Sequence, residues 1–247
     1  MKRSKPKYLE KKWKKCEIYS GLLTPFPILV RLDGRNFSNL LSKFEKPYDL
    51  RFAKVMVESG KELMREFNAL FAFTFSDEIT FFFPTELFGG RVEKINSIIS
   101  SEFSSRVSLR LGMPVSFDSR IITPSGNDVW EYLAWRQEEA WRNHLNSYAF
   151  YTLLKEIGDR REVQKYLNGK KSDELHDILF QRGINPAKNP PWQKRGIFLH
   201  WKEVEFEREF DGRIVRFKRR RIVENWEPPL FSTDEGRNYL VEILSQL

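Results

Sequence analysis

The order of apolar and amphipathic segments predicts an α+β protein built on a ferredoxin-like core. Three observations lead to this fold class. Short β-rich apolar runs follow one another early in the chain, two amphipathic segments with helical spacing interrupt them, and an Asp-Gly pair joins two further strand-like runs near the end. The expected core has the order strand, helix, strand, strand, helix, strand, with an added helical region and a C-terminal β-hairpin.

The first strand and the first core helix lie between residues 28 and 67. The run Ile28-Leu29-Val30-Arg31-Leu32 is apolar and ends abruptly at Asp33-Gly34-Arg35, as a central strand does at a turn. Across residues 49–67, apolar side chains recur at spacings of three and four. This pattern predicts an amphipathic helix that returns over the sheet.

A hairpin, a second helix and a fourth strand complete the core. The strand-like runs 70–75 and 79–83 are separated only by Ser76-Asp77-Glu78, which is short enough for a tight turn. A second amphipathic helix is expected from Arg91 to about Leu109, and residues 115–122 have the composition of a fourth strand. In this topology strands one and three lie side by side and antiparallel.

The segments on either side of the core divide the chain into three parts. Residues 1–24 should hold a basic amphipathic helix over 8–19, and residues 25–124 the catalytic core. Residues 125–247 should form a long or broken helix over 128–157, a shorter helix over 173–181, a hairpin and a C-terminal helix, packed on the core. The hairpin is expected at Asp211-Gly212, between strands 196–210 and 213–223.

Charge and composition point to a polyanionic partner. The 42 basic and 34 acidic residues give a net charge of +8, which suits nucleic acid or an anionic membrane surface. No apolar run has the length of a membrane span, so we expect a soluble, cytoplasmic protein. Cys16 is the single cysteine and the three histidines are scattered, which excludes an internal disulfide and a recognisable zinc motif. Carboxylates must therefore hold any bound metal.

Two acidic residues are brought together by the expected topology. Asp33 ends strand one and Asp77 precedes strand three, and these two ends meet at one edge of the sheet. Two carboxylates that close repel each other unless a cation neutralises them, and oxygen ligands select Mg²⁺ or Mn²⁺. We therefore predict a two-metal site held by Asp33, Asp77 and the carbonyl of Gly34, of the kind used in nucleotide transfer.

The same turn is predicted to bind a nucleotide triphosphate. Residues Gly34-Arg35-Asn36-Phe37-Ser38 leave strand one with successive backbone N–H groups that can form a phosphate cradle. Further candidate phosphate ligands are Lys46, Arg91 and Lys94. Glu78 is a third candidate catalytic carboxylate, although strand alternation directs its side chain away from that of Asp77.

Two other functions fit the same pattern. An Asp-Gly turn and a Ser-Asp-Glu hairpin tip are also ordinary structural features. An RNA-binding module of the RNA-recognition type shares the strand order and would stack bases on Phe81 to Phe83. A palm-type nucleotidyl cyclase would use Asp33 and Asp77 without tRNA.

Several strings in the chain occur together in one known family. In order, they are Arg31-Leu32-Asp33-Gly34-Arg35-Asn36-Phe37, Phe44-Glu45-Lys46-Pro47, Ser76-Asp77-Glu78, Phe117-Asp118-Ser119-Arg120, Trp135-Arg136-Gln137 and Trp192-Gln193-Lys194-Arg195-Gly196. Over residues 25–202 the chain thereby resembles the tRNA(His) guanylyltransferases. Eukaryotic members carry histidine at the position of Ser38 and a His-Ile-Asn-Asn-Leu-Tyr-Asn string at the position of Trp141 to Ser147. In both places this chain resembles the archaeal and bacterial branch instead.

This resemblance implies a polymerase-palm domain that adds nucleotides to the 5′ end of tRNA in the 3′-to-5′ direction. ATP or GTP would activate the tRNA 5′ end, and the 3′-hydroxyl of the incoming nucleotide would then attack. By the same resemblance, Asp33, the Gly34 carbonyl and Asp77 would hold two Mg²⁺, and residues 34–38 with Ser76 would line the triphosphate site. The reaction would be guanylyl transfer to tRNA(His), template-dependent 5′-end repair, or both, in a homotetramer.

The second half of the chain supplies candidate tRNA contacts. They are Arg136, Arg142, Asn143, Lys194 and Arg195. Arg136 and Asn143 share one face of the long predicted helix because they lie seven residues apart. The alternative for these helix residues is hydrogen bonding inside the helical region or at a tetramer interface.

Overall fold

The computed structural model describes residues 7–40, 44–125, 128–210 and 213–245. Its strands are β1 (Ile28–Gly34), β2 (Phe71–Phe75), β3 (Glu78–Phe83), β4 (Phe117–Ile122), β5 (Ile197–Phe210) and β6 (Arg213–Asn225). Its α-helices are α1 (Lys7–Lys14), α2 (Phe37–Leu40), α3 (Leu50–Phe67), α4 (Val92–Leu111), α5 (Asp128–Ile157), α6 (Arg160–Leu167), α7 (Ser172–Phe180), α8 (Pro191–Arg195) and α9 (Asp234–Leu244). Two 3₁₀ turns, η2 (Phe88–Gly90) and η3 (Pro186–Lys188), complete the described elements.

The strands form one antiparallel sheet in the order β4-β1-β3-β2-β5-β6. The first four have the ferredoxin-like order that the sequence predicts, and β1 lies beside β3 with Asp33 opposite Glu78. The α+β fold class and the central topology are therefore confirmed.

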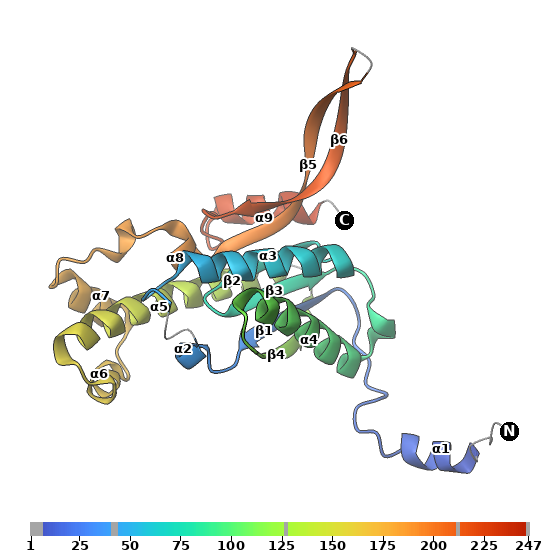
Figure 1. Cartoon of the computed structure of the whole chain (residues 1–247), viewed down its shortest axis with the longest axis horizontal. Coiled ribbons are helices and arrows are strands. Elements are labelled where there is room, and N and C mark those ends of the chain that lie inside the picture. The colour runs from blue at the N-terminus through green and yellow to red at the C-terminus, as the bar shows by residue number, and fades with distance from the viewer. Residues whose placement is uncertain (1–6, 41–43, 126–127, 211–212, 246–247) are drawn as a thin grey trace.

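Helices cover the two faces of the sheet (Figure 1). One core lies between the sheet and helices α3 and α4, and includes Val30 and Leu32 of β1. A second core lies on the opposite face, where Leu29 packs with residues of α5 and α9. Alternation along β1 sends neighbouring side chains to opposite cores, so both faces of this central strand are apolar.

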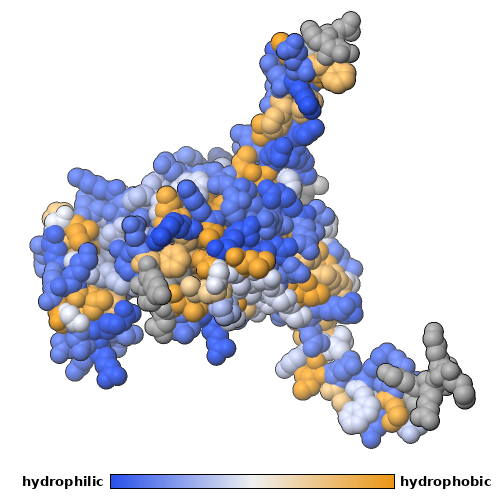
Figure 2. Space-filling model, viewed as in Figure 1, coloured by the Kyte–Doolittle hydropathy of each residue, from blue (hydrophilic) through white to orange (hydrophobic). Residues whose placement is uncertain are grey.

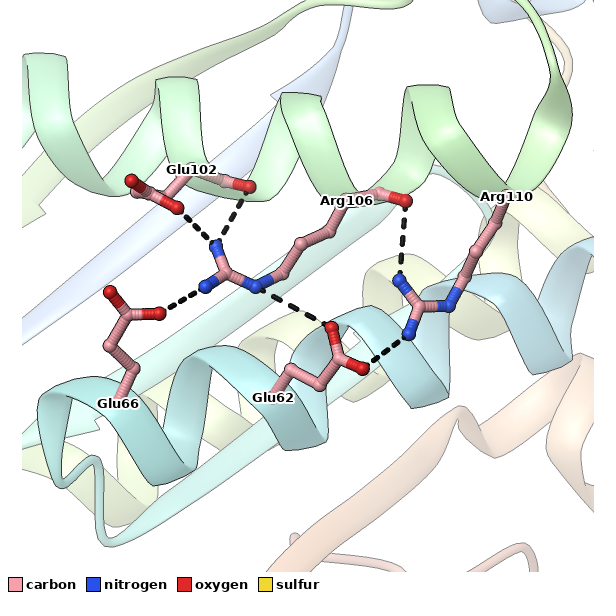
Figure 3. A network of polar contacts seen from close by, with 5 residues as sticks. All are labelled: Glu62, Glu66, Glu102, Arg106 and Arg110. Carbon is pink, nitrogen blue, oxygen red and sulfur yellow. Dashed lines mark hydrogen bonds and ion pairs between the residues drawn. The ribbon is translucent and has the colours of Figure 1, made fainter.

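Charged side chains tie α3 to α4 (Figure 3). The guanidinium of Arg106 on α4 reaches Glu62 and Glu66 on α3 as well as Glu102 on its own helix. Arg110, one turn later, bonds Glu62 across 2.6 Å. This network adds ion pairs between partly exposed side chains to the contact between the two helices.

The second half of the chain begins with α5, a single helix of 30 residues. Its N-terminal part packs on the sheet, whereas Leu145, Ala149 and Leu153 form a separate small core with α6 and α7. The expected long helix is thus unbroken. Helix α6 was not expected from the sequence, because only Val163 and Leu167 supply its apolar face.

Strands β5 and β6 extend beyond the sheet as an arm (Figure 1). β5 pairs with β2 only from Ile197 to His200, and its remaining residues pair with β6 alone. We use the name arm for residues 202–210 and 213–221. The predicted turn at Asp211-Gly212 lies outside the described residues.

The N-terminal helix lies away from the sheet (Figure 1). Helix α1 ends at Lys14, so it is shorter than the helix expected over residues 8–19. Both this segment and the arm carry apolar residues among charged ones (Figure 2). No helix of the described residues combines the length and apolarity required to cross a membrane.

Candidate active site

Two carboxylates meet where β1 ends and β3 begins. Asp33 lies opposite Glu78 on β3 and opposite Asp118 on β4. The backbone N–H of Gly34 donates to the carbonyl oxygen of Asp77 across 3.1 Å. The topology therefore brings Asp33 and Asp77 to one edge of the sheet, as the sequence predicts.

Gly34 allows this close approach. A Cβ atom at position 34 would lie 2.9 Å from the Cβ of Asp77 and would also meet the ring of Phe37. Any side chain here would force the two segments apart. The glycine of the Asp-Gly turn is consequently required by packing as well as by turn geometry.

Both carboxyl groups hold their protons more tightly than usual. Burial raises the pKa of Asp77 to about 6, and the negative charge of Asp33 adds to this rise. Burial and the neighbouring carboxylate of Asp118 raise the pKa of Asp33, although Arg31 and Arg120 oppose the rise. Hydrogen bonds from its own backbone N–H and from the Ser76 hydroxyl, 3.1 Å from Oδ1, oppose the rise in the pKa of Asp77, whereas no cationic side chain of the described residues does.

The oxygen atoms at this edge are suitable ligands for a hard divalent cation. Two carboxylates and the carbonyl of Gly34 are oxygen ligands, and Mg²⁺ accepts few protein ligands because it retains several waters. Within the described ranges, no group of three or more His, Cys, Asp or Glu side chains could hold a metal. An ion here would therefore depend on the backbone oxygen, water and phosphate for its remaining ligands.

A cavity of about 330 Å³ opens beside Asp77. Of the residues expected to bind nucleotide, it includes Gly34, Asn36, Phe37, Lys46, Ser76 and Asp77. Asp33 does not line this cavity, because its side chain shares the other face of the sheet with the paired Glu78. The two carboxylates thus approach the edge from opposite faces.

The backbone of the expected phosphate cradle is partly used by the fold. The N–H of Gly34 donates to Asp77, and the N–H of Arg35 donates to the carbonyl of Ser116 across 2.9 Å. These two groups cannot bind phosphate at the same time, which corrects the prediction of successive available N–H groups for the first two residues of the turn. The side chain of Ser38 lies outside the described part of the chain.

Phe37 anchors the turn instead of exposing its ring. The ring is buried and lies 5.5 Å from that of Phe52 and 5.1 Å from that of Phe117. Asn36, which precedes it, has a φ of 61°, a left-handed conformation that asparagine tolerates better than most residues. The turn is consequently fixed by apolar packing of a ring that also forms part of the cavity wall.

The three candidate phosphate cations fall at different places. Lys46 lines the cavity, with its ammonium 5.5 Å from the centre of the Tyr151 ring. Arg91 and Lys94 lie at the N-terminal end of α4, where Arg91 pairs with Leu23 before the chain enters β1. Neither Arg91 nor Lys94 lines the cavity, and Nε of Arg91 donates to the carbonyl of Phe88 across 3.0 Å. Contact of these two side chains with a nucleotide stays a prediction.

Comparison with known proteins agrees with this geometry. Residues 10–125 match the family model described as tRNAHis guanylyltransferase, and residues 127–228 match that described as Thg1 C terminal domain. A tRNA(His) guanylyltransferase of Schizosaccharomyces pombe is 33% identical over 221 residues, which are 83% of this chain and 84% of that protein. This chain belongs to the tRNA(His) guanylyltransferase family. The family is one of nucleotidyltransferases.

Other relatives show how far the likeness extends. A probable tRNA(His) guanylyltransferase of Dictyostelium discoideum is 31% identical over 80% of this chain and 84% of that protein. The tRNA(His) guanylyltransferase 1 of Arabidopsis thaliana is 29% identical over 228 residues, which are 85% of this chain but only 40% of that protein. A bacterial guanylyltransferase-like protein solved in complex with ATP has a TM-score of 0.77 and 23% identity, over 95% of this chain and 98% of that one. This last likeness supports the palm-type fold.

The sequence predicts Glu78 as a catalytic residue and Arg136 as a tRNA contact. In this chain the two form a buried ion pair instead, with Nε and Nη2 of Arg136 at 2.8 and 2.6 Å from the two carboxylate oxygens. Their exposures are only 7% and 5%. The guanidinium is also 4.4 Å from the centre of the Trp135 ring. Both expectations are corrected, because neither group reaches solvent or the cavity.

The other candidate tRNA contacts lie on α5 and α8. Arg142 is exposed and pairs with Glu139 across 3.2 Å, and Asn143 is half-buried. Lys194 donates to the carbonyl of Ala187, and Arg195 accepts a hydrogen bond from Gln137 at its own backbone carbonyl. None of these side chains lines the active-site cavity. Their contact with tRNA stays a prediction.

Aromatic residues of the cavity wall were not predicted from the sequence. Tyr48, Tyr151 and Trp192 line it together with Ser147. The ring of Tyr48 lies edge-on to Trp192 at 5.9 Å. Ser147 and Tyr151 lie one helical turn apart on α5, so the spacing of polar and aromatic residues along that helix was the available signal.

Base stacking on the central strands is excluded by burial. Phe81, Phe82 and Phe83 are at most 2% exposed, and they pack in the two cores. The proposal of an RNA-recognition module with bases stacked on β3 is therefore wrong. Aromatic residues in this sheet fill the interior.

Proposed function

We propose that this chain adds nucleotides to the 5′ end of tRNA in the 3′-to-5′ direction. The reaction would be guanylyl transfer to tRNA(His), template-dependent 5′-end repair, or both. The observation that carries the proposal is the meeting of Asp33 and Asp77 around Gly34 beside a cavity that also contains Lys46. Family membership supports transfer to tRNA(His) as the coarse activity.

Asp33, the carbonyl of Gly34 and Asp77 would hold Mg²⁺, as two ions in the full site. When bound, Mg²⁺ would neutralise phosphate charge and favour the ionised form of the attacking hydroxyl. The raised pKa of Asp77 supports this assignment, because a buried carboxyl without a cationic partner gains most from a bound cation. Asp118, opposite Asp33, adds negative charge on the other side of the strand.

The cavity would take the triphosphate of GTP or ATP. Two solved bacterial relatives are described as complexes with GTP and with ATP. A volume of about 330 Å³ falls in the range of small-molecule sites, which is about 300 to 1,000 Å³. Lys46 supplies a cation for phosphate, and Tyr48 with Trp192 supplies aromatic surface for a base.

In the transfer step, the 3′-hydroxyl oxygen of the incoming nucleotide would form a bond to phosphorus at the activated 5′ end and lose its proton to solvent water. The P–O bond to the leaving phosphate group would break, and that group would depart with the bonding electrons. The chain would hold the two reacting ends beside Asp33 and Asp77. Its contribution is positioning and charge stabilisation, as in other phosphoryl transfers.

The arm supports RNA as the partner because its two faces differ in charge. Strand pairing places Glu203, Glu205, Glu207 and Glu209 on one face, together with Arg216, Lys218 and Arg220. Two of these cations form ion pairs, Arg216 with Glu207 at 2.7 Å and Lys218 with Glu205 at 3.7 Å. This face is therefore largely neutralised by its own side chains.

The opposite face of the arm has cations and rings but no acidic residue. It contains Lys202, Arg208, Arg219 and Arg221, with Val204, Phe206, Val215 and Phe217 between them. The rings of Phe206 and Phe217 stack at 5.8 Å, and the guanidinium groups of Arg219 and Arg221 lie over them at 4.8 and 5.5 Å. Arginine held on a ring keeps its N–H groups available for phosphate. We infer that this face contacts the tRNA backbone.

The test is incubation of the purified protein with Mg²⁺, ATP and labelled GTP. Intact tRNA(His) and 5′-truncated tRNAs of other identities are supplied in parallel, and gel mobility reports the nucleotides added. Extension of truncated tRNAs according to the template indicates 5′-end repair, whereas extension of tRNA(His) alone indicates dedicated guanylyl transfer. Pyrophosphate release without any RNA indicates a cyclase, and RNA binding without extension contradicts the proposal.

Matched variants test the site. Asp33→Asn and Asp77→Asn should each lower transfer by at least about a hundredfold, because each removes a charged ligand. Asp177→Asn on α7 is the control, since this exposed aspartate lies outside the cavity. Full transfer by both Asp33→Asn and Asp77→Asn would overturn the metal assignment.

A further inference from the structure

A second hollow adjoins the active-site cavity. It has a volume of about 590 Å³ and lies between α5, α6 and residues 168–170, which lead to α7. Ser147 and Tyr151 of α5 line both spaces. A ligand in the hollow would therefore lie directly beside a nucleotide in the cavity.

The hollow is lined by cations and amides without a carboxylate. Its charged residues are Arg142, Arg160 and Lys170, and its amide side chains are Asn146, Gln164 and Asn168. No aspartate or glutamate of the described residues lines it. Guanidinium and ammonium groups suit phosphate, and amides can both donate to and accept from the edge of a base.

Arg160 is the cation most available to a ligand. It begins α6, is exposed and takes part in no ion pair with a described residue. Its guanidinium lies 5.2 Å from the centre of the Phe150 ring, which also lines the hollow. Arg142 and Lys170 share their charge with glutamates of their own segments, Glu139 at 3.2 Å and Glu174 at 3.5 Å.

We propose that the hollow binds one nucleotide unit of a single-stranded RNA end, next to the nucleotide in the active-site cavity. The inference rests on the proposed function, because RNA is the expected substrate. Sites for single strands combine cations that follow the backbone with rings that stack on bases, and Arg160 over Phe150 provides both. Gln164, one turn further along α6, places an amide beside them.

The experiment measures binding of a short, 5′-phosphorylated, fluorescent single-stranded RNA by anisotropy. Arg160→Ala and Gln164→Ala are compared with Arg161→Ala, which removes the same charge from the adjacent position outside the hollow. For Arg160→Ala we expect a Kd about tenfold higher. The slope of log Kd against log salt concentration should be shallower by about 0.7, the value for one phosphate contact on a single strand. Arg161→Ala should change the Kd by less than about twofold.

A free nucleoside triphosphate has the same chemistry as an RNA unit, so ATP and GTP binding are titrated in the same variants. If Arg160→Ala weakens triphosphate binding and leaves oligonucleotide binding intact, the RNA assignment is overturned in favour of a free nucleotide. Equal effects of Arg160→Ala and Arg161→Ala, or no effect on either ligand, would overturn the site itself. Thermal melting of each variant verifies that it is folded.

Binding in an Asp77→Asn background separates this inference from the proposed function. Oligonucleotide binding that depends on Arg160 in that background supports the hollow as an RNA site, whether or not the wild-type chain transfers nucleotides. If the wild-type chain transfers nucleotides but Arg160→Ala and Gln164→Ala bind the oligonucleotide as well as wild type does, the proposed function is supported and the inference is overturned.

Discussion

The carboxyl group of Asp77 links stability to pH. Its pKa is about 6 in the folded chain, and an unfolded aspartate has a pKa of about 3.9. Between these values the native state binds the proton and the unfolded chain does not, so stability without metal falls as pH rises from about 4 to about 6. Asp77→Asn should therefore be more stable than wild type at pH 7 by about 1 to 2 kcal/mol, and nearly equal at pH 4. Urea unfolding in a chelator measures the difference.

With Mg²⁺ bound, wild type should be more stable than Asp77→Asn at pH 7. Because the ion requires an ionised carboxylate, Mg²⁺ should raise the unfolding midpoint of wild type at pH 7 much more than at pH 5. Asp77→Asn should gain little at either pH. An equal gain by wild type and Asp77→Asn would show that Asp77 is not a ligand. Asp177→Asn serves again as the variant with an unchanged site.

The buried pair of Glu78 and Arg136 is a structural element of the site. Glu78→Gln should lower the free energy of unfolding by about 3 kcal/mol, because it leaves the Arg136 guanidinium buried without its counter-charge. The double variant Glu78→Gln, Arg136→Gln should regain part of this loss. A catalytic Glu78 predicts the opposite pattern, with transfer lost and the urea midpoint unchanged.

The two faces of the arm should differ in how much they contribute to tRNA binding. The pair Arg219→Ala, Arg221→Ala removes two cations from the acid-free face, whereas Arg216→Ala, Lys218→Ala removes two from the ion-paired face. The first variant should bind tRNA about tenfold more weakly, with a salt dependence shallower by about 2. The second should bind within about threefold of wild type. Equal losses would mean that net charge alone, and not the face, determines affinity.

Elements with a strong repeating pattern were predictable from the sequence, and short ones were not. Helix α3 and the strands β1 to β4 bury a regular set of apolar side chains, so periodicity located them. Helices α2 and α8 have four and five residues, which is too short for a repeat to appear. Their positions depend on contacts such as the buried ring of Phe37, which belong to the folded chain.

The site was predictable where it depends on topology. Asp33 and Asp77 stand at strand ends, so the order of the strands was enough to bring them together. The cavity wall was not predictable, since Tyr48 and Tyr151 lie about a hundred residues apart and meet only through the packing of α5. The pairing of Glu78 with Arg136 was hidden for the same reason.

The exposed N-terminal segment indicates where copies of the chain assemble. Trp13 and Ile18 are 60% and 73% exposed, and Leu22 and Leu23 follow on the same segment. A cluster of exposed apolar side chains usually marks a contact with another protein. We predict a homotetramer in which residues 7–23 pack against another copy of the chain.

Light scattering after size exclusion tests this prediction. Wild type should have four times the 29.5 kDa mass of the chain, and Trp13→Ser combined with Ile18→Ser should shift the mass to smaller species. Leu109→Ser is the control, because Leu109 is 81% exposed on α4 and apart from the N-terminal segment. A wild-type monomer would contradict the tetramer. A tetramer that survives Trp13→Ser with Ile18→Ser would place the interface elsewhere, since losing two large apolar contacts at each of its copies would otherwise shift the equilibrium by several kcal/mol.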